Sequence, residues 1–359
     1  MLFNVCALYI KIMNNENQTI HKSDDNLTIY GWNEKLNQLK QESIYSTLAH
    51  GRVSIVHRTC YEVISGNGLF QCELTGNMMY GKSDDELPCT GDWVIFQPFD
   101  EHKGIIVDRL PRERTLYRKK SGTVADKQAI ASYVDKAFIV QSLDDNFNVR
   151  RVERFMVQIM EENISSVLVL NKADLDFDRQ SVEEQIKHIS SQIPVFFTSI
   201  HQLETIVRLR KSISEGETVV FVGSSGVGKS SLVNALCEKP VLLTSDISLS
   251  TGKGRHTSTR REMVLMDSSG VLIDTPGVRE FGLAIDNPDS LAEVLEISDY
   301  AELCRFKDCK HINEPGCAVI EAVNSGALDS KVYASYLKLR REAWHFSASE
   351  HEKRKKEKS

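Results

Sequence analysis

The sequence predicts a multidomain protein with an all-β barrel near the N-terminus, a central α/β domain and a mostly helical C-terminal domain. Three observations support this prediction. Short alternating strands fill residues 47–117, strands alternate with helices over residues 118–284, and three cysteines and a histidine gather within residues 304–317. A chain of 359 residues is long enough for several domains, each with its own core.

The composition is ordinary for a globular protein, with 41% hydrophobic and 26% charged residues. The formal net charge of -6 argues against a wholly basic nucleic-acid-binding protein, although it permits local basic patches. No apolar run has the length of a membrane helix, and the apolar N-terminus has neither a preceding basic residue nor a cleavage site. We therefore expect a cytoplasmic protein that does not enter a membrane.

The first two segments differ in patterning. Residues 1–46 are polar and rich in asparagine, so we expect a loosely packed extension with one short helix at Glu34–Glu42. Residues 47–117 alternate in hydrophobicity between turn signals, which predicts about five short strands and a small barrel. The OB-fold is the best candidate for that barrel. The predicted strands are Arg52–His57, Tyr61–Ile64, Leu69–Leu74, Trp93–Phe96 and Gly104–Asp108.

From residue 118 to 284 the pattern is typical of an α/β domain with a largely parallel sheet. Between the first two strands, apolar residues from Val149 to Met160 recur at helical spacing, so the methionines there belong to the core. The predicted strands are Ala137–Gln141, Val167–Leu170, Val195–Thr198, Thr218–Val222, Met263–Met266 and Val271–Asp274. We expect residues 285–359 to be helical around the cysteine cluster and to end in a frayed basic tail.

A phosphate-binding loop of the form G-x-x-x-x-G-K-S follows one of these strands and precedes a helix beginning near Ser231. Its glycines allow backbone N–H groups to turn toward phosphate oxygens, and the helix N-terminus faces the same anion. Lys229 would reach the β- and γ-phosphates, and Ser230 would ligate Mg²⁺. The residues expected to contact the phosphates are Gly223, Ser224, Ser225, Gly226, Val227, Gly228, Lys229, Ser230 and Ser231.

The sequence Asp274-Thr275-Pro276-Gly277 ends the last predicted strand, about fifty residues after the phosphate loop. At that position Asp274 would hold Mg²⁺, either directly or through water. The backbone amide of Gly277 would contact the γ-phosphate. Asp-Thr-Pro alone is compatible with an ordinary turn, so the assignment depends on the phosphate loop.

The sequence Asn171-Lys172-Ala173-Asp174 follows another strand and predicts a guanine site. The carboxylate of Asp174 can accept both N–H donors of guanine, whereas adenine would leave a charge unpaired. Asn171 would bind N7 and tie loops together, and the Lys172 stem would cover the base. The segment around Ser199 is a candidate for a backbone N–H to guanine O6. This base motif precedes the phosphate loop, so the domain is predicted to be circularly permuted.

The C-terminal cluster Cys304-x₄-Cys309-x-His311-x₅-Cys317 predicts a tetrahedral Zn²⁺ site. Three thiolates and an imidazole leave no open coordination position, so we expect one structural zinc ion. The residues between the ligands have no apolar core, and the metal would supply much of the local folding free energy. The other five cysteines are scattered, and we expect no disulfides in a reducing compartment.

Over roughly residues 47–335 the chain resembles the circularly permuted GTPases of bacteria that depend on the small ribosomal subunit. The resemblance depends on the base motif, the phosphate loop, Asp274–Gly277, the zinc cluster and the segment Thr251–Arg260 between them. It implies a plan of OB-fold, permuted GTPase and zinc domain. It also implies a role in late maturation of the 30S subunit, contact with 16S rRNA, and GTP hydrolysis stimulated by that subunit.

The same resemblance identifies His256 as a catalytic side chain. Val278 follows Gly277, where Ras-like GTPases place a water-orienting Gln, so that function must come from elsewhere. Thr257 or Thr259 would ligate Mg²⁺ when GTP is bound, and the sequence does not choose between them. We assign catalysis to His256, Lys229 and Gly277. Hydrolysis is expected to be slow until a partner orders the segment around Gly254.

Two other functions compete with this interpretation. A P-loop ATPase or kinase is disfavoured by Asn171 and Asp174, and the missing Gln lends weight to a GTP-binding rRNA scaffold without significant turnover. Basic residues between barrel and α/β domain, and again on a late helix, suggest phosphate contacts with RNA. These residues are Arg112, Arg114, Arg118, Lys119, Lys120, Lys338, Arg340 and Arg341. We expect a monomer with four parts: 1–46, 47–117, 118–284 and 285–359.

Overall fold

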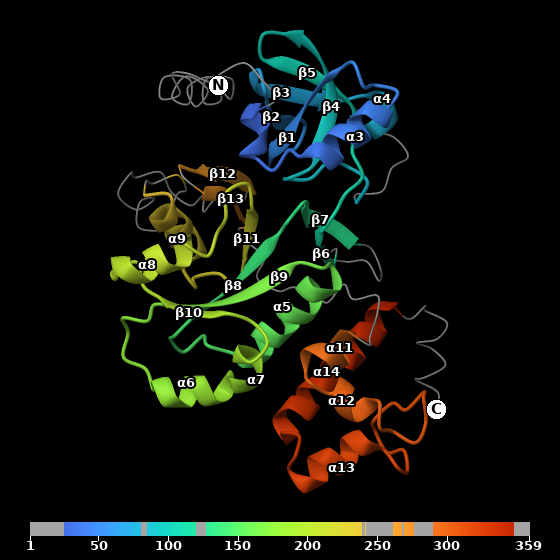
Figure 1. Cartoon of the computed structure of the whole chain (residues 1–359), viewed down its shortest axis with the longest axis vertical. Helices are drawn as coiled ribbons and strands as arrows, with labels where there is room; N and C mark the ends of the chain where they lie inside the picture. Colours follow the sequence, from blue (N-terminus) through green and yellow to red (C-terminus); the bar gives the residue numbers. More distant parts are fainter. Residues whose placement is uncertain are drawn as a thin grey trace.

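The computed structural model describes residues 25–79, 85–119, 127–238, 241, 261–267, 269–275 and 290–347. A β-barrel lies at one end of the molecule, a mixed sheet with helices lies in the middle, and the C-terminal helices lie at the other end (Figure 1). In the described part of the chain, every helix is too short or too polar to span a lipid bilayer.

The barrel is closed by five strands. The strand order is β1-β2-β3-β5-β4, and β4 returns to pair with β1. All pairings are antiparallel except β3 with β5. Alternate residues such as Val53, Val63, Phe96 and Ile106 fill the interior. The strands are β1 (Ala49–Val56), β2 (Tyr61–Ser65), β3 (Gly68–Leu74), β4 (Trp93–Asp100) and β5 (Lys103–Arg109), with the short helix α4 (Gly76–Met79) after β3.

The segment before the barrel packs more tightly than the sequence predicts. Helix α3 (Glu34–Glu42) has the expected bounds, and the side chain of Asn33 caps it by accepting the N–H of Leu36. The short helix α2 (Asp25–Thr28) precedes it. Trp32 is buried, and its ring lies 4.8 Å from that of Trp93 on the barrel. Residues 25–46 are therefore part of the barrel's outer core, because their apolar side chains cover strand β4.

The central sheet has the order β10-β9-β8-β11-β13-β12. The first five strands are parallel, and only β12 is antiparallel to its neighbour. Parallel strands need crossover connections, and the strand–helix alternation of the sequence supplies them. The strands are β8 (Lys136–Ser142), β9 (Ser165–Asn171), β10 (Val195–Thr198), β11 (Thr218–Val222), β12 (Glu262–Met266) and β13 (Ser269–Asp274).

Helices cover both faces of this sheet, which explains why its strands are apolar throughout. Helices α8 (Leu203–Arg210) and α9 (Lys229–Leu236) pack on one face. Helix α5 (Val149–Glu161) packs on the other, and Met156 is fully buried there as expected. The short helices α6 (Arg179–Gln185) and α7 (Lys187–Ser190) add Val182 and Ile189 to that second core.

The barrel and the central sheet are joined in two ways. The hairpin of β6 (Leu116–Lys119) and β7 (Lys127–Ala131) carries the chain between them. In addition, Ile55 of β1 pairs antiparallel with Glu262 of β12, so the two sheets form one continuous sheet. The edge of β12 is therefore paired with the barrel at its first residue, Glu262.

The buried side chain of Arg52 reinforces this junction. Its guanidinium donates to the carbonyl of Gly91 at 3.0 Å and to Thr218 Oγ1 at 2.9 Å. It also donates to the carbonyl of Tyr30 and lies within 3.5 Å of the carbonyls of Ser132 and Tyr133. Arg52 thus connects the N-terminal segment, the barrel and the first residue of β11, the strand that leads into the phosphate loop.

The C-terminal helices are present as expected, but they share a core with the central domain. Leu291, Leu295 and Tyr336 belong to the same buried cluster as Met156 of α5. An ion pair of 2.8 Å between Arg154 and Glu342 adds a link between α5 and α14. These helices are α11 (Ser290–Val294), α12 (Ser298–Ala301), α13 (Ala318–Ser325) and α14 (Ser330–Ser347).

Candidate functional site

The predicted nucleotide motifs meet at the carboxyl edge of the central sheet. The base motif begins at the end of β9, the phosphate loop follows β11, and Asp274 ends β13. In parallel α/β sheets, ligands bind at this edge because loops from neighbouring strands converge there. Segments 171–174 and 223–230 are therefore neighbours in space despite their separation in the sequence.

The phosphate loop has a backbone conformation that only glycine adopts readily at Gly223, Gly226 and Gly228. Gly223 has φ +147 and Gly228 has φ +95. A β-carbon at Gly223 would lie 2.3 Å from the carbonyl oxygen of Val140, and one at Gly228 would lie 2.3 Å from Asn171 Nδ2. The loop is thus pressed against the ends of β8 and β9, and neither position has room for a side chain.

Lys229, the first residue of α9, is folded back over the loop. Its Nζ donates to the carbonyls of Gly223 and Ser224, both at 2.8 Å. Burial lowers the pKa of the Lys229 amine, and the nearby carboxylate of Asp274 opposes that shift. The loop around it contains Ser225, Gly226 and Val227, and Ser231 follows in the first turn of α9.

Ser230 and Asp274 place two side-chain oxygens side by side. Ser230 Oγ donates to Asp274 Oδ2 at 2.8 Å. Burial raises the pKa of the Asp274 carboxyl, and the hydrogen bond from Ser230 and the charge of Lys229 oppose that shift. Asp274 Oδ1 is buried without a partner among the described residues. A hydroxyl oxygen beside an unpartnered carboxylate oxygen is a donor set that Mg²⁺ accepts.

Asn171 joins the two motifs. Its Nδ2 donates to the carbonyl of Val227 at 2.9 Å, and its Oδ1 accepts from Thr198 Oγ1 at 3.3 Å. The backbone N–H of Ala173 donates to the carbonyl of Thr198 at 3.0 Å. The ends of β9 and β10 and the phosphate loop are therefore held together by one amide side chain and its neighbours.

The carboxylate of Asp174 is exposed, and a hydrogen bond with the Ser199 side chain is the main cause that lowers its pKa. It is therefore ionised at neutral pH, as an acceptor for two N–H donors must be. The backbone N–H of Ser199 donates to Thr205 Oγ1 at 3.0 Å. The amide of Ser199 is thus engaged within the protein, and Ser199 also contacts Asp174 through its hydroxyl.

Sequence reasoning missed Asp144, which lies just after β8. Its Oδ2 accepts a hydrogen bond from Lys172 Nζ at 2.8 Å. An acidic residue in a loop has no motif around it, so only its position two residues beyond the end of a strand pointed to this edge of the sheet. Four further predicted residues, His256, Thr257, Thr259 and Gly277, lie outside the described residues.

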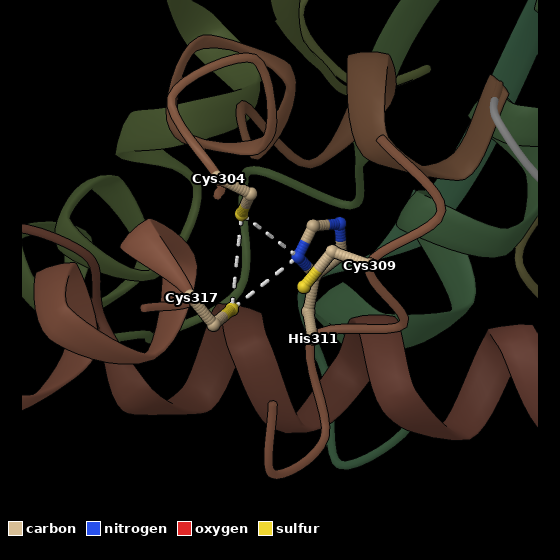
Figure 2. Close-up of side chains that lie close together, drawn as sticks. All are labelled: Cys304, Cys309, His311 and Cys317. Carbon is tan, nitrogen blue, oxygen red and sulfur yellow. Dashed lines mark hydrogen bonds between the residues drawn. The ribbon is translucent and has the colours of Figure 1, made fainter. Parts of the chain in front are cut away.

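The predicted metal ligands come together near the C-terminal helices (Figure 2). The Sγ atoms of Cys304 and Cys317 lie 3.8 Å apart, and His311 Nδ1 lies 3.4 Å from each. All four ligand atoms, including that of Cys309, lie within 4.8 Å of one another. Tetrahedral zinc bonds imply about 3.8 Å between sulfurs and about 3.5 Å between sulfur and nitrogen, so this donor set fits the ion.

The loop that carries these ligands is organised by polar contacts. The side chain of Glu314 accepts the backbone N–H groups of Lys310, Ile312 and Asn313 at 2.9–3.1 Å. Tyr333 of α14 donates to the carbonyl of His311 at 2.6 Å. Such contacts hold the loop in one conformation, and outer-sphere partners orient the ligand residues of metal sites in the same way.

One member of the predicted RNA-binding set has a structural role. The side chain of Arg112 is 7% exposed and forms a 2.7 Å ion pair with the fully buried Asp92. It also donates to the carbonyls of Asp85 and Leu87. Arg112 is therefore not available to phosphates, because its donors are used inside the protein. Arg114 pairs with Asp135 at 2.9 Å but is one-third exposed, and Lys338 and Arg341 are exposed on α14.

Several known proteins resemble this chain in sequence or in structure. A family model described as RsgA GTPase matches residues 109–284. A Bacteroides thetaiotaomicron protein named "Small ribosomal subunit biogenesis GTPase RsgA 1" is 75% identical over 347 residues, 97% of this chain and 96% of its own. YjeQ from Thermotoga maritima has a similar structure, with a TM-score of 0.61, 26% identity, and coverage of 82% of this chain and 98% of its own.

A second solved structure, titled "The crystal structure of YloQ, a circularly permuted GTPase", has a TM-score of 0.60. The likeness covers 84% of this chain and 97% of that one at 22% sequence identity, so it concerns the fold alone. The permuted motif order of the sequence therefore has a counterpart in a protein of similar fold.

Proposed function

The chain belongs to the RsgA family of GTPases, and on that premise we propose that it binds the small (30S) ribosomal subunit and couples GTP hydrolysis to the late maturation of that subunit. The observation that carries the proposal is the meeting of base motif, phosphate loop and Asp274 at one edge of the sheet. The relative that is 75% identical has a role in small-subunit biogenesis according to its name.

GTP and GDP would bind across the joined motifs. Asp174 would accept the two N–H donors of guanine, and Asn171 would contact N7 while it holds the phosphate loop. Lys172 and Ala173 would cover the base, and Ser199 would orient Asp174. Support comes from the lowered pKa of Asp174 and from the Asn171–Val227 hydrogen bond. Discrimination against adenine follows because adenine would leave the carboxylate unpaired.

Residues Gly223–Ser231 would hold the phosphates, with Lys229 turned toward the β- and γ-phosphates. Ser230 and Asp274 would hold Mg²⁺, together with Thr257 or Thr259 from the segment before β12. When bound, the ion neutralises charge that develops on the phosphate oxygens. The unpartnered Oδ1 of Asp274 supports this role, because a buried carboxylate oxygen without a donor is costly.

Hydrolysis would depend on His256, with Lys229 and the Gly277 amide stabilising the transferred phosphoryl group. Val278 stands where Ras-like GTPases carry a water-orienting Gln, so His256 would orient the attacking water. We propose that the small subunit brings His256 into place. Stimulation of 10³–10⁵-fold corresponds to roughly 4–7 kcal/mol of transition-state stabilisation.

Further parts of the proposal concern the flanking regions. The closed barrel with strand order β1-β2-β3-β5-β4 would be an OB-fold, and its surface would contact 16S rRNA. Cys304, Cys309, His311 and Cys317 would hold one structural zinc ion. We propose a cytoplasmic monomer with boundaries near residues 46, 117 and 284.

The test is phosphate release from GTP with and without purified 30S subunits. We expect slow release alone, strong stimulation by the subunit, and competition by GDP but not by ATP. His256→Ala should keep GTP affinity and lose stimulated turnover, whereas Glu184→Ala at an exposed position of α6 should match the wild type. Full stimulated turnover in His256→Ala would show that another group orients the water.

The second candidate is a GTP-binding rRNA scaffold without significant turnover. Val278 is the observation that favours it, because a valine cannot orient water. The same assay separates the two functions, since a scaffold would bind GTP and 30S subunits without releasing phosphate.

A further inference from the structure

Lys172, the lysine of the base motif, is held at its charged end by a residue outside that motif. Its Nζ lies 2.8 Å from Asp144 Oδ2, with the two side chains 35% and 24% exposed. Asp144 lies in the loop between β8 and α5, whereas Lys172 follows β9. The backbone brings them together because Leu143 N–H donates to the carbonyl of Asn171, which continues the β8–β9 pairing beyond the strands.

The Asp144 carboxylate is itself fixed. Its Oδ1 accepts from Ser142 Oγ at 2.7 Å and from the backbone N–H of Asn146 at 3.0 Å. Burial raises the pKa of this carboxyl, but the hydrogen bonds from Lys172, Ser142 and Asn146 outweigh it and leave the pKa well below its usual range. Asp144 is therefore an ionised acceptor with both oxygens in use, and it cannot turn away from Lys172 without breaking other bonds.

Lys172 is also fixed at its backbone. Its φ is +62, a left-handed conformation that is uncommon for a residue with a side chain. Its carbonyl accepts from the N–H of Leu175 at 3.0 Å, and the next residue, Ala173, donates to Thr198. With the backbone and Nζ both held, the four methylene groups between them have little freedom left.

The charge of Lys172 also bears on Asp174. Lys172 is close enough to that carboxylate for its charge to contribute to the lowered pKa of Asp174. A lysine free to swing would pair with Asp174 and compete with the N–H donors of guanine. The bond to Asp144 prevents this competition, because Nζ is already engaged by another carboxylate.

We propose that Asp144 is a positioning residue of the guanine site, an inference that rests on the proposed GTP-binding function. It anchors Lys172 Nζ so that the methylene stem is preorganised to cover the face of the base and Asp174 stays open to guanine. Ordering of a long side chain is then complete before nucleotide binds, which favours affinity. Because the contact concerns the base, GTP and GDP benefit equally.

The test uses the full-length protein with Asp144→Asn. Asparagine keeps the size and loses the charge, and we expect the Kd values of GDP and GTP to rise by the same factor, about three- to tenfold. The substitution should raise Kd and KM. The kcat measured with saturating GTP and 30S subunits should stay within about twofold of the wild-type value. Added salt should weaken GDP binding more in the wild type than in the variant, because only the wild type has the ion pair.

Four further variants make the result decisive. Asp144→Glu should restore affinity because it restores the carboxylate, and Asp145→Asn, at the exposed neighbour, should match the wild type. Lys172→Met alone and combined with Asp144→Asn should bind GDP equally, since Asp144 would act only through Lys172. This comparison of single and double variants also keeps the test valid if one single variant folds poorly.

The outcomes separate this inference from the proposed function. Unchanged Kd in Asp144→Asn, or unequal losses for GTP and GDP, would overturn the positioning role while wild-type turnover remained intact. A wild-type protein that fails to bind GDP would instead overturn the proposed function.

Discussion

Ser230 and Asp274 are 44 residues apart in sequence, yet Ser230 Oγ donates a hydrogen bond to Asp274 Oδ2 at 2.8 Å. The pair joins the first turn of α9 to the end of β13. Since Asp274 is 1% exposed, its second oxygen is available only to what enters the site. This arrangement supports the proposal that the carboxylate binds a cation, and it predicts that the carboxylate contributes little to the stability of the fold.

Substitution Asp274→Asn should stabilise the protein without Mg²⁺ and nucleotide, by about 1 kcal/mol, while abolishing Mg²⁺-dependent GTP binding. The pKa of Asp274 is raised in the folded protein. At pH values between the ordinary and the raised pKa, the folded protein therefore binds more protons than the unfolded chain. Wild-type stability therefore falls as pH rises through that range, and the variant lacks this fall. Thermal midpoints at about pH 5 and about pH 7.5 test the difference.

Exposed Glu215→Gln is the matched control for that measurement. It should leave the thermal midpoint unchanged at both pH values. A variant Asp274→Asn that is less stable than the wild type at neutral pH would mean that the carboxylate supports the fold.

Substitution Asp174→Asn should weaken GTP binding by roughly a hundredfold, because two hydrogen bonds to a charged acceptor are lost. Xanthine carries a carbonyl where guanine carries an amine, so the new amide should favour xanthosine triphosphate. Titrations with both nucleotides measure the switch. Asp176→Asn, two residues away and exposed, should bind GTP as the wild type does.

Substitution Arg52→Met should lower the free energy of unfolding by about 2–4 kcal/mol, because the carbonyls of Gly91 and Tyr30 lose a charged donor. Burial lowers the pKa of Arg52 to about 10, so the guanidinium is still charged at neutral pH. Urea unfolding measures the loss. Arg58→Met, at an exposed arginine in the next turn, should change stability little, and equal losses in both would contradict the junction role.

Removal of the bound metal should loosen the C-terminal segment. Cys317 is 3% exposed and precedes α13 directly, so Cys317→Ser should lose zinc and expose the chain around α13 to protease. Metal analysis of the wild type should give one zinc per chain. Cys60→Ser in the barrel should keep that stoichiometry, and zinc retained by Cys317→Ser would exclude this ligand set.

Local patterns were enough to predict most of the secondary structure. The helix Glu34–Glu42 and the strand Val195–Thr198 have the predicted bounds, because a capping Asn and an apolar run are local signals. The order of the nucleotide motifs likewise predicted the permuted fold, since each motif needs only its own strand end. The cluster of three cysteines and a histidine that could hold a metal ion was predicted for the same reason, within residues 304–317.

Contacts between segments that are far apart in the sequence could not be predicted from local patterns. The sequence suggested that Arg112 is a solvent-exposed cation. In the structure its side chain instead pairs with the buried Asp92, twenty residues earlier. Arg52 was part of an alternating strand, and nothing near it indicated that Thr218 would be its partner. Asp144 was missed because its role arises only when β8 and β9 bring it to Lys172.

The core shared by α5 and the C-terminal helices restricts how this protein can be dissected or recombined. A fragment ending after β13 would remove Leu291, Leu295 and Tyr336 from the core that they share with α5, and would expose apolar side chains of that core. Such a fragment should aggregate, so its inactivity would say nothing about zinc or ribosomes. Chimaeras that exchange the C-terminal segment between relatives should succeed only when α5 is exchanged along with it.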